Sequence, residues 1–161
     1  MSPLWTAREI AEAAQGRVHG DFEANGVAFD SREIGKGDLF IAMKGEATDG
    51  HRFLGQAFGA GAAGALVSEE IAEPHVHVAD TVRALNDLGR ASRARSGARI
   101  AGVTGSVGKT GTKEALFAAL ARSARGKAHR SIKSYNNHTG VPLSLARMPR
   151  EARFGVFEMG M

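Results

Sequence analysis

The sequence predicts an α/β protein: a small N-terminal α/β domain, then the start of a second domain in which a phosphate-binding loop connects a parallel sheet to a helix. Short apolar runs alternate with helix-like segments along the 161 residues, as in α/β proteins. A stretch crowded with arginine, serine and glycine, residues 90–99, separates two such series and places the domains at 1–96 and 97–161. A glycine-rich stretch, residues 103–110, then joins an apolar run to a helix-like run.

The composition indicates a folded protein that binds an anionic ligand. Hydrophobic residues make up 43% of the chain, enough to build cores, and the absence of cysteine excludes disulfides and thiolate metal sites. The formal net charge of +4 suits a nucleotide or a diphosphate. Nucleic acid is a less favoured partner, because aromatic residues are few and the basic residues are scattered. The sequence shows neither the apolar core of a signal peptide nor a run long enough to span a membrane, so we expect a cytoplasmic protein.

The first helix is predicted from a capping box. In this motif the side chain of Thr6 caps the first turn and Glu9 reaches back to the Thr6 backbone, so the helix should begin at Ala7, and Gly16 should end it. Apolar runs and helical periodicity predict strands at 17–19, 26–30, 39–43, 65–67 and 75–78, and helices at 52–60 and 81–95.

Polar residues at two of these strand ends are candidate binding groups. Residues 30–32 (Asp-Ser-Arg) follow one strand, and the glycine-containing loop 44–51 follows the next. His75 and His77 lie on one face of a further predicted strand. A metal site would need more ligands nearby, and none is apparent from the sequence, so we expect both histidines on an exposed face.

Residues 103–110 have the features of a phosphate-binding loop. Glycines allow successive backbone N–H groups to point at one anion, and the N-terminus of the following helix adds a partial positive charge. Lys109 could then reach the outer phosphates, and the hydroxyl of Thr110 could ligate magnesium. The general motif has glycine at the place of Val103, so the sequence implies a variant loop whose first turn is at Gly105. A glycine-rich turn without a ligand is the alternative interpretation.

Later elements of the second domain should place a carboxylate beside this loop. The expected elements are a helix at 112–121 with Leu116 and Leu120 facing the sheet, strands at 127–130 and 154–157, and a short helix that starts at Pro142. Because parallel strands share one carboxyl edge, Glu158 should lie beside Lys109 and Thr110, either as a second magnesium ligand or as a solvated strand-end residue. Such sheets typically have five or six strands and about three are predicted here, so we expect a fragment of a larger protein.

In combination, these motifs resemble those of the Mur ligases over essentially the whole chain. The loop 104–110 matches the family pattern T-G-x-x-G-K-[ST], which lacks the earlier glycine and so accounts for Val103. The other matching segments are 30–32, 37–40, 44–45, 49–51, 113–114, 136–137, 140–142 and 158–160. The chain departs from the pattern at His138 and Thr139, where an acidic residue and isoleucine are frequent, and at Gly111, where serine or threonine is usual.

The resemblance implies a three-domain ligase of peptidoglycan synthesis that uses ATP and Mg²⁺. The first domain would hold the UDP end of the substrate, the central domain ATP, and the third the incoming dipeptide. ATP would convert the substrate carboxylate to an acyl phosphate, from which the dipeptide amine displaces phosphate. The segments 136–137, 140–142 and 158–160 most resemble the branch that joins D-alanyl-D-alanine to UDP-N-acetylmuramoyl-tripeptide. We expect this chain alone to have no ligase activity.

The resemblance also implies roles for individual residues. Lys109 and Asn137 would be catalytic, and Thr110 and Glu158 would hold magnesium. The residues expected around the ATP phosphates are Thr104, Gly105, Ser106, Val107, Gly108, Lys109 and Thr110. The residues expected to contact the UDP-linked substrate are Ser31, Arg32, Lys44, Asp49, His51, Asn136 and Asn137.

Two alternatives stay open at this point. One is a sister enzyme, either the ligase that adds the third peptide residue or a folate polyglutamate ligase. The asparagine pair 136–137 and the segment 37–40 disfavour the folate branch. The other alternative is a non-catalytic nucleotide-binding module, which would bind nucleotide without a preference for UDP-linked peptides.

Overall fold

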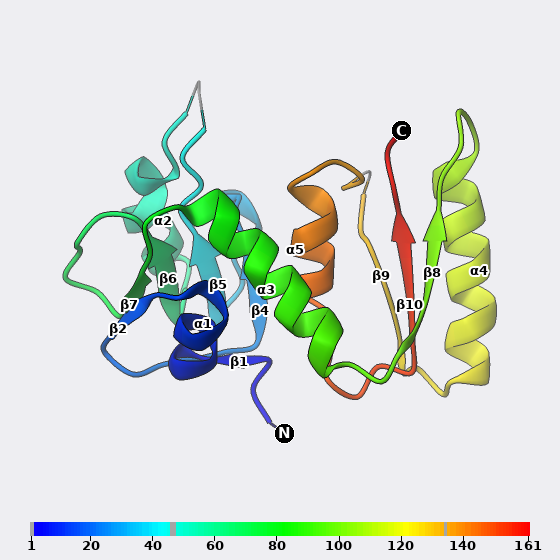
Figure 1. Ribbon diagram of the computed structural model, residues 1–161, viewed down its shortest axis with the longest axis horizontal. Coiled ribbons are helices and arrows are strands. Elements are labelled where there is room, and N and C mark those ends of the chain that lie inside the picture. Colours follow the sequence, from blue (N-terminus) through cyan, green and yellow to red (C-terminus); the bar gives the residue numbers. More distant parts are fainter. Residues whose placement is uncertain (1, 46–47, 134) are drawn as a thin grey trace. The chain divides into compact units, whose positions relative to one another are not determined.

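The computed structural model describes residues 2–45, 48–133 and 135–161, and the chain divides into two compact units. The N-terminal unit comprises Met1–Leu88 and the C-terminal unit Gly89–Met161. Helix α3, Thr81–Arg95, contains the point of division (Figure 1). The domain boundary that we predicted after residue 96 stays a prediction.

The N-terminal unit is built on a five-stranded sheet in the order β2-β7-β6-β5-β4. The strands are β2 (Arg17–His19), β4 (Gly26–Ala28), β5 (Asp38–Ile41), β6 (Gly64–Val67) and β7 (His75–His77). Strands β4 to β7 are parallel and β2 is antiparallel to β7, so β2 is an edge strand. A two-residue strand, β1 (Trp5–Thr6), pairs separately with β3 (Glu23–Ala24).

Helix α1, Ala7–Ala14, begins as predicted and ends differently. The capping box is present, since Glu9 N donates to Thr6 Oγ1 at 3.2 Å and Thr6 N donates to Glu9 Oε2 at 2.9 Å. The left-handed residue that ends the helix is Gln15, with a φ of 54°, and not Gly16. Gly16 is required for another reason: a Cβ there would lie 2.7 Å from the carbonyl oxygen of His77.

The helix predicted at 52–60 is preceded by a tighter turn. It starts as the 3-10 helix η2, Gly50–Phe53, and continues as α2, Leu54–Gly59. Strand β4 ends at Ala28, two residues before the end of the strand predicted at 26–30, and a second 3-10 helix, η1 (Ser31–Glu33), begins after it. The buried residues that hold α2 against the sheet are Phe40, Ala42, Ala57, Ala65 and Val67.

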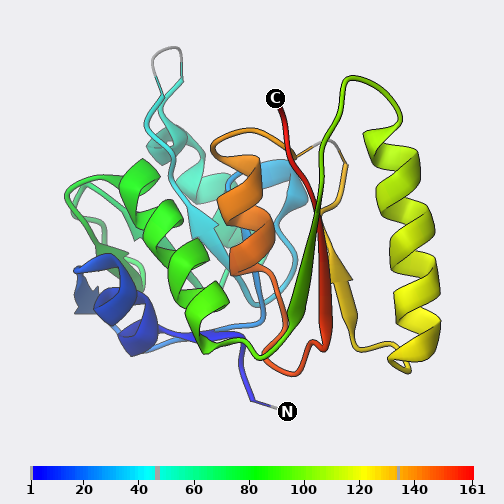
Figure 2. The ribbon, with the colours of Figure 1, turned by 45° about the vertical axis from the view of Figure 1, so that its right-hand side comes forward.

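The C-terminal unit contains a three-stranded parallel sheet in the order β8-β10-β9. Its strands are β8 (Arg99–Val103), β9 (Ala128–Arg130) and β10 (Phe154–Glu158), and its helices are α4 (Lys109–Ser123) and α5 (Gly140–Ala146). The two helices lie on opposite sides of the sheet (Figure 2). Helix α4 begins three residues before the predicted start at Thr112, and α5 begins at Gly140 rather than at Pro142.

The two leucines predicted to face the sheet do so. Leu116 and Leu120 of α4 line a cavity of about 360 Å³ together with Ile100 of β8 and Phe154 of β10. On the other side of the sheet, the core consists of Ala98, Met148, Ala152 and Phe157. Strand β10 therefore contributes side chains to both faces of the sheet, and both helices pack around it beside β8, the strand that leads into the loop described next.

Candidate functional site

The glycine-rich loop leaves the end of β8 in a conformation that suits an anion. Gly105 and Gly108 have φ angles of 146° and 76°, which residues with a side chain rarely adopt. Within the described part of the chain, the amides of residues 106 to 108 donate no hydrogen bond. They precede α4, a helix of 15 residues whose N-terminus carries a partial positive charge. Amides and helix end together form a ready site for a phosphate group.

The ammonium group of Lys109 lies over this loop. It donates a hydrogen bond to the carbonyl oxygen of Gly105, four residues earlier in the chain. The side chain of Val107, at the tip of the loop, is 87% exposed, so the loop is open to solvent. A phosphate bound by the loop amides would find the cation already beside it, and the contact to Gly105 could be exchanged for one to the ligand.

The two residues expected to bind magnesium are in direct contact. Strand β10 pairs with β8 in the register Glu158↔Val103, so both strands end at the same level. Thr110 Oγ1, in the first turn of α4, donates to Glu158 Oε2 at 3.0 Å. A hydroxyl and a carboxylate are oxygen donors of the kind that Mg²⁺ prefers. The expectation that strand direction would bring Glu158 to the loop therefore agrees with the structure.

A buried lysine completes this cluster. Lys113, one turn after Lys109 on α4, is fully buried, and its Nζ lies 3.5 Å from Glu158 Oε2. It also donates to the carbonyl oxygen of Lys133 at 3.0 Å and lies 3.5 Å from Glu114 Oε1. The sequence contained a signal for this role, since positions 109, 110 and 113 share one face of a helix, but our sequence analysis gave Lys113 no function.

Polar contacts hold the Glu158 carboxylate in its ionised form. Burial would raise the pKa of Glu158, but the hydrogen bonds from Thr110 and Asn136 and the charge of Lys113 outweigh burial and lower the pKa below its ordinary value. The bond from Asn136 Nδ2 to Glu158 Oε1 measures 3.1 Å, and Glu158 N donates to Ser131 Oγ at 3.0 Å. The carboxylate is thus kept charged at the edge of the loop.

The two asparagines occupy different positions in this network. Asn136 contacts Glu158, as described, whereas Asn137 organises the start of α5. Asn137 Oδ1 accepts from Gly140 N at 2.7 Å and from Thr139 Oγ1 at 3.1 Å. Its amide Nδ2 is the remaining polar group of the side chain that could face a substrate.

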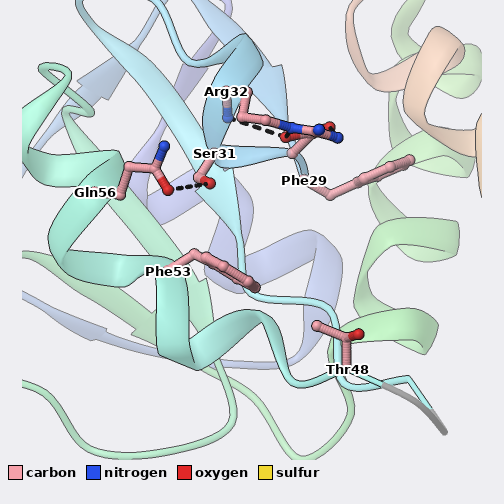
Figure 3. Close-up of a pocket in the computed structure, with 7 residues that line it drawn as sticks. Phe29, Ser31, Arg32, Thr48, Phe53 and Gln56 are labelled. Atoms are coloured by element: carbon pink, nitrogen blue, oxygen red, sulfur yellow. Dashed lines mark hydrogen bonds and ion pairs between the residues drawn. The ribbon is translucent and has the colours of Figure 1, made fainter.

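The N-terminal unit contains a separate cavity of about 430 Å³. Ser31 and Arg32, two of the residues predicted to contact the substrate, are among its lining residues (Figure 3). Ser31 Oγ donates to Gln56 Oε1 at 3.0 Å, and the Arg32 guanidinium forms a two-point contact with Asp30. Both side chains are therefore held in place by the fold.

Sequence analysis missed four residues that line the same cavity. They are Phe29, Thr48, Phe53 and Gln56. Phe29 immediately precedes the predicted 30–32 segment, but the other three come from a loop and helices that are distant in sequence, so no local pattern connects them with Ser31. The rings of Phe29 and Phe53 give the cavity two aromatic walls (Figure 3).

The other residues predicted for this pocket form a polar cluster in the adjoining loop, of which residues 46–47 lie outside the described chain. Asp49 accepts from the backbone N–H of His51 at 3.0 Å and contacts His51 Nδ1 at 2.6 Å. These bonds lower the pKa of Asp49. Ser68 N donates to His51 Nε2 at 3.0 Å, and Lys44 Nζ lies 4.0 Å from Asp49 Oδ2. The cluster shapes the loop and is not among the groups that line the cavity.

The prediction that both strand histidines lie on an exposed face is wrong for His75. This residue is 1% exposed, because the ring of His19 from the edge strand β2 covers it. Glu70, in the loop that precedes β7, lies beside both rings. The sequence did not reveal this grouping, since antiparallel pairing of β2 with β7 is a tertiary feature.

Known protein families match residues in both structural units. Residues 23–95 match the family model described as "Mur ligase family, catalytic domain", and residues 103–161 match "Mur ligase middle domain". A UDP-N-acetylmuramoyl-tripeptide–D-alanyl-D-alanine ligase of Bacillus subtilis is 39% identical over 97% of this chain and 36% of its own length. The Escherichia coli ligase of the same name is 35% identical over 96% of this chain and 34% of its own length.

Solved structures show the same relationship. A UDP-N-acetylmuramoylalanyl-D-glutamyl-2,6-diaminopimelate–D-alanyl-D-alanyl ligase from Acinetobacter baumannii superposes with a TM-score of 0.83 at 35% identity, over 98% of this chain and 36% of that one. The MurF ligase from Thermotoga maritima in complex with ADP has a TM-score of 0.64 at 30% identity, over 84% and 32% of the two chains.

The described residues contain no helix that is both long and apolar enough to cross a membrane. The chain spans about a third of the length of the curated relatives that it matches. The two family models together match residues in both structural units, and the glycine-rich loop lies within the second match. The chain therefore belongs to the Mur ligase family.

Proposed function

We propose that this chain contributes the UDP-substrate pocket and the first part of the ATP site to a ligase that joins D-alanyl-D-alanine to UDP-N-acetylmuramoyl-tripeptide. The observation that carries the proposal is the cluster of Thr110, Lys113, Asn136 and Glu158 beside the glycine-rich loop. The relatives named above act on this pair of substrates according to their names, and one solved relative holds ADP. We also expect the protein to act in the cytoplasm.

The loop would hold the β- and γ-phosphates of ATP. Backbone amides at 106–108 and the start of α4 provide donors without a side-chain rearrangement, and Lys109 adds a cation. Phosphoryl transfer requires mainly positioning and neutralisation of charge, and these groups supply both.

Thr110 and Glu158 would hold the magnesium ion that accompanies ATP. Their oxygens are already 3.0 Å apart and the carboxylate is kept ionised, so the donor set fits a hard divalent cation. When bound, Mg²⁺ would neutralise negative charge on the phosphates during transfer. Lys113 and Asn136 would orient the Glu158 carboxylate for this purpose.

The proposed reaction has two steps. An oxygen of the tripeptide carboxylate attacks the γ-phosphorus of ATP, the bond to the β–γ bridging oxygen breaks, and ADP leaves. The amine of D-alanyl-D-alanine then attacks the acyl carbon, the acyl–oxygen bond breaks, inorganic phosphate leaves and the amine nitrogen loses a proton. Carboxylate alone is a poor electrophile, which is why the phosphorylated intermediate is required. Asn137 Nδ2 is positioned on the loop that we propose faces the substrate.

The cavity of the N-terminal unit would bind the UDP end of the substrate. Ser31 and Arg32 offer polar groups for the diphosphate and ribose, while Phe29 and Phe53 offer ring faces for uracil. Lys44, Asp49 and His51 would support the neighbouring loop. This division assigns the UDP end of the substrate and ATP to two separate sites.

Calorimetric titration of the chain tests the proposal directly. A UDP-N-acetylmuramoyl peptide and Mg-ATP should each bind, in separate titrations, to the purified protein. Replacement of Phe53 by alanine should weaken binding of the UDP ligand by about tenfold, since stacking of a base on an aromatic ring contributes about 1–3 kcal/mol. The same replacement should leave Mg-ATP affinity unchanged.

Val18→Ala is the matched control, because Val18 is 42% exposed in the same unit and is not a lining residue of the cavity. Binding of Mg-ATP without any binding of the UDP ligand would instead favour a nucleotide-binding module of another function. If UDP-sugars with and without a peptide bind equally well, this chain does not recognise the peptide, and other parts of a longer ligase would have to recognise it.

A further inference from the structure

His75 carries a buried ring nitrogen that has no hydrogen-bond partner in the described part of the chain. Its Nδ1 lies 2.8 Å from the carbonyl oxygen of Glu73, and because a carbonyl oxygen can only accept, Nδ1 carries the proton. In the neutral ring, Nε2 then holds a lone pair. The side chain is 2% exposed, and among the described residues Nε2 forms no hydrogen bond. A buried, unsatisfied acceptor is costly, so its persistence calls for an explanation.

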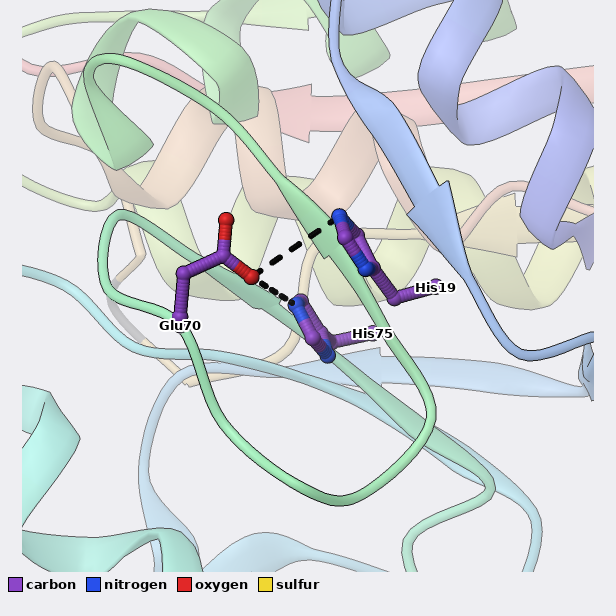
Figure 4. Close-up of side chains that lie close together, drawn as sticks. All are labelled: His19, Glu70 and His75. Atoms are coloured by element: carbon purple, nitrogen blue, oxygen red, sulfur yellow. Dashed lines mark ion pairs between the residues drawn. The ribbon is translucent and has the colours of Figure 1, made fainter.

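Two further residues place ligand atoms near this nitrogen. His19 lies directly opposite His75 in the β2–β7 ladder, and the two imidazoles stack with centroids 4.5 Å apart and an interplanar angle of 2°. Glu70 Oε2 lies 3.6 Å from His75 Nε2 and 3.8 Å from His19 Nε2 (Figure 4). One ligand atom from each residue lies within 4.8 Å of the others.

We propose that His19, Glu70 and His75 form a binding site for a divalent transition metal ion, with Zn²⁺ as its best-suited occupant. Two imidazole nitrogens and one carboxylate oxygen are a frequent zinc donor set. Bonds of about 2.0–2.2 Å in tetrahedral geometry separate ligand atoms by roughly 3.4 Å. The N···O distances of 3.6 and 3.8 Å therefore need to shorten by only a few tenths of an ångström. Because the stacked rings are parallel and an imidazole lone pair lies in the ring plane, the exposed His19 ring must also turn so that both Nε2 atoms face the ion.

The site is partly preorganised. The contact of His75 Nδ1 with Glu73 O is the outer contact that commonly fixes a metal-binding histidine and directs its other nitrogen at the ion. His19 and Glu70 have side chains that are 41% and 58% exposed, so they can adjust to the ion, and the cluster is open to solvent on their side. Three protein ligands leave a fourth position for water.

The location suggests a structural effect of the ion. His19 belongs to the edge strand β2, which pairs in this sheet with β7 alone, and Glu70 belongs to the loop between β6 and β7. A bound ion would connect the edge strand β2, the loop and the sheet, at a place where β2 is attached to β7 by only three residue pairs. Metal binding should consequently stabilise the N-terminal unit.

A second cluster with similar composition is less suitable. Asp49, His51 and Glu69 also lie within reach of one another, but both nitrogens of His51 are already engaged, by Asp49 Oδ1 and by Ser68 N. A metal ion there would have to replace two hydrogen bonds. At the proposed site, the competing cation is Arg17, which lies 3.3 Å from the other carboxylate oxygen, Glu70 Oε1, and leaves Oε2 for the ion.

Titration of the 161-residue chain with Zn²⁺ in a non-chelating buffer at pH 7.5, in competition with a chromophoric chelator, tests the site. We expect one ion per chain. Glu70→Gln and His19→Ala, both at exposed side chains, should each lower the affinity at least about tenfold, because changes in outer contacts alone typically cost 10–100-fold. Glu69→Gln removes the same charge one residue away and should leave the affinity unchanged.

Two additional measurements separate a metal site from loss of fold or of charge. Co²⁺ in place of Zn²⁺ should give the visible absorption of a tetrahedral complex in the natural chain and in Glu69→Gln but not in His19→Ala. Zn²⁺ should raise the unfolding temperature of the natural chain more than that of Glu70→Gln. The proposal is overturned if Zn²⁺ does not bind at micromolar concentration, if both glutamine variants bind equally well, or if Glu69→Gln alone loses binding.

Discussion

Replacement of Lys109 by alanine should lower ATP turnover by about 10²- to 10³-fold in a ligase that contains this chain, the usual effect of removing one preorganised group that stabilises charge in a transition state. Lys109 directly follows the amides of the glycine-rich loop in the chain, and its ammonium already contacts the loop through the carbonyl oxygen of Gly105. As charge develops on the transferred phosphoryl group, no other loop side chain can neutralise it.

The same variant should bind the UDP-linked substrate normally. The cavity with Ser31, Arg32 and Phe53 belongs to the N-terminal unit, whereas Lys109 belongs to the C-terminal unit. Turnover is measured as phosphate release by a ligase that contains this chain and is as long as the curated relatives. Binding is measured by calorimetric titration of the present chain with the UDP-linked substrate and with Mg-ATP. Lys127→Ala is the control, because Lys127 is an exposed lysine of the same unit. Equal losses of turnover and of UDP-substrate binding would show that our assignment of two separate sites is wrong.

The sequence predicted those features that depend on local pattern. The capping box of Thr6 and Glu9 predicted the start of α1, and the sequence pattern at 98–121 predicted a glycine-rich loop between a strand and a helix, as found between β8 and α4. The general rule for the carboxyl ends of parallel strands placed Glu158 beside Thr110, and their hydrogen bond agrees with it. Each of these predictions used only residues that are close together in the sequence or one general rule of sheet topology.

Features that depend on contacts between residues far apart in the chain could not be predicted from the sequence. Helical spacing places Lys113 on the face of Lys109 and Thr110, but its burial could not be predicted, because that depends on Lys133 and Glu158, 20 and 45 residues further along the chain. His75 was expected on an exposed face because nothing in a single strand shows that an antiparallel edge strand will cover it. Phe53 and Ser31 line one cavity because η1 and η2 follow β4 and β5, two strands that pair in parallel, and this pairing cannot be deduced from the sequence of either loop.

Replacement of Lys113 by methionine should lower the free energy of unfolding of the C-terminal unit by about 3–5 kcal/mol, the usual result of removing one partner of a buried ion pair. Lys113 is fully buried and Glu158 is 2% exposed, so the remaining carboxylate would have no water to replace the ammonium. Methionine keeps the volume of the stem, which limits the contribution of a cavity. Denaturant unfolding measures the change, and Lys127→Met is the matched control at an exposed position.

The pH dependence distinguishes loss of charge from poor packing. The pKa of Glu158 lies below its ordinary value of 4.5, against the effect of burial, so the ionised carboxylate stabilises the fold above about pH 4.5 and this stabilisation is lost as the pH falls through the folded pKa. The difference between the natural chain and Lys113→Met should therefore be largest near pH 7 and decrease as Glu158 becomes protonated. The double variant Lys113→Met/Glu158→Gln should recover part of the lost stability, because it leaves no buried charge. A difference that stays constant from pH 7 until the pH is well below 4.5, where Glu158 of the folded chain is also protonated, would assign the effect to packing, and the ion pair would then have no part in positioning Glu158.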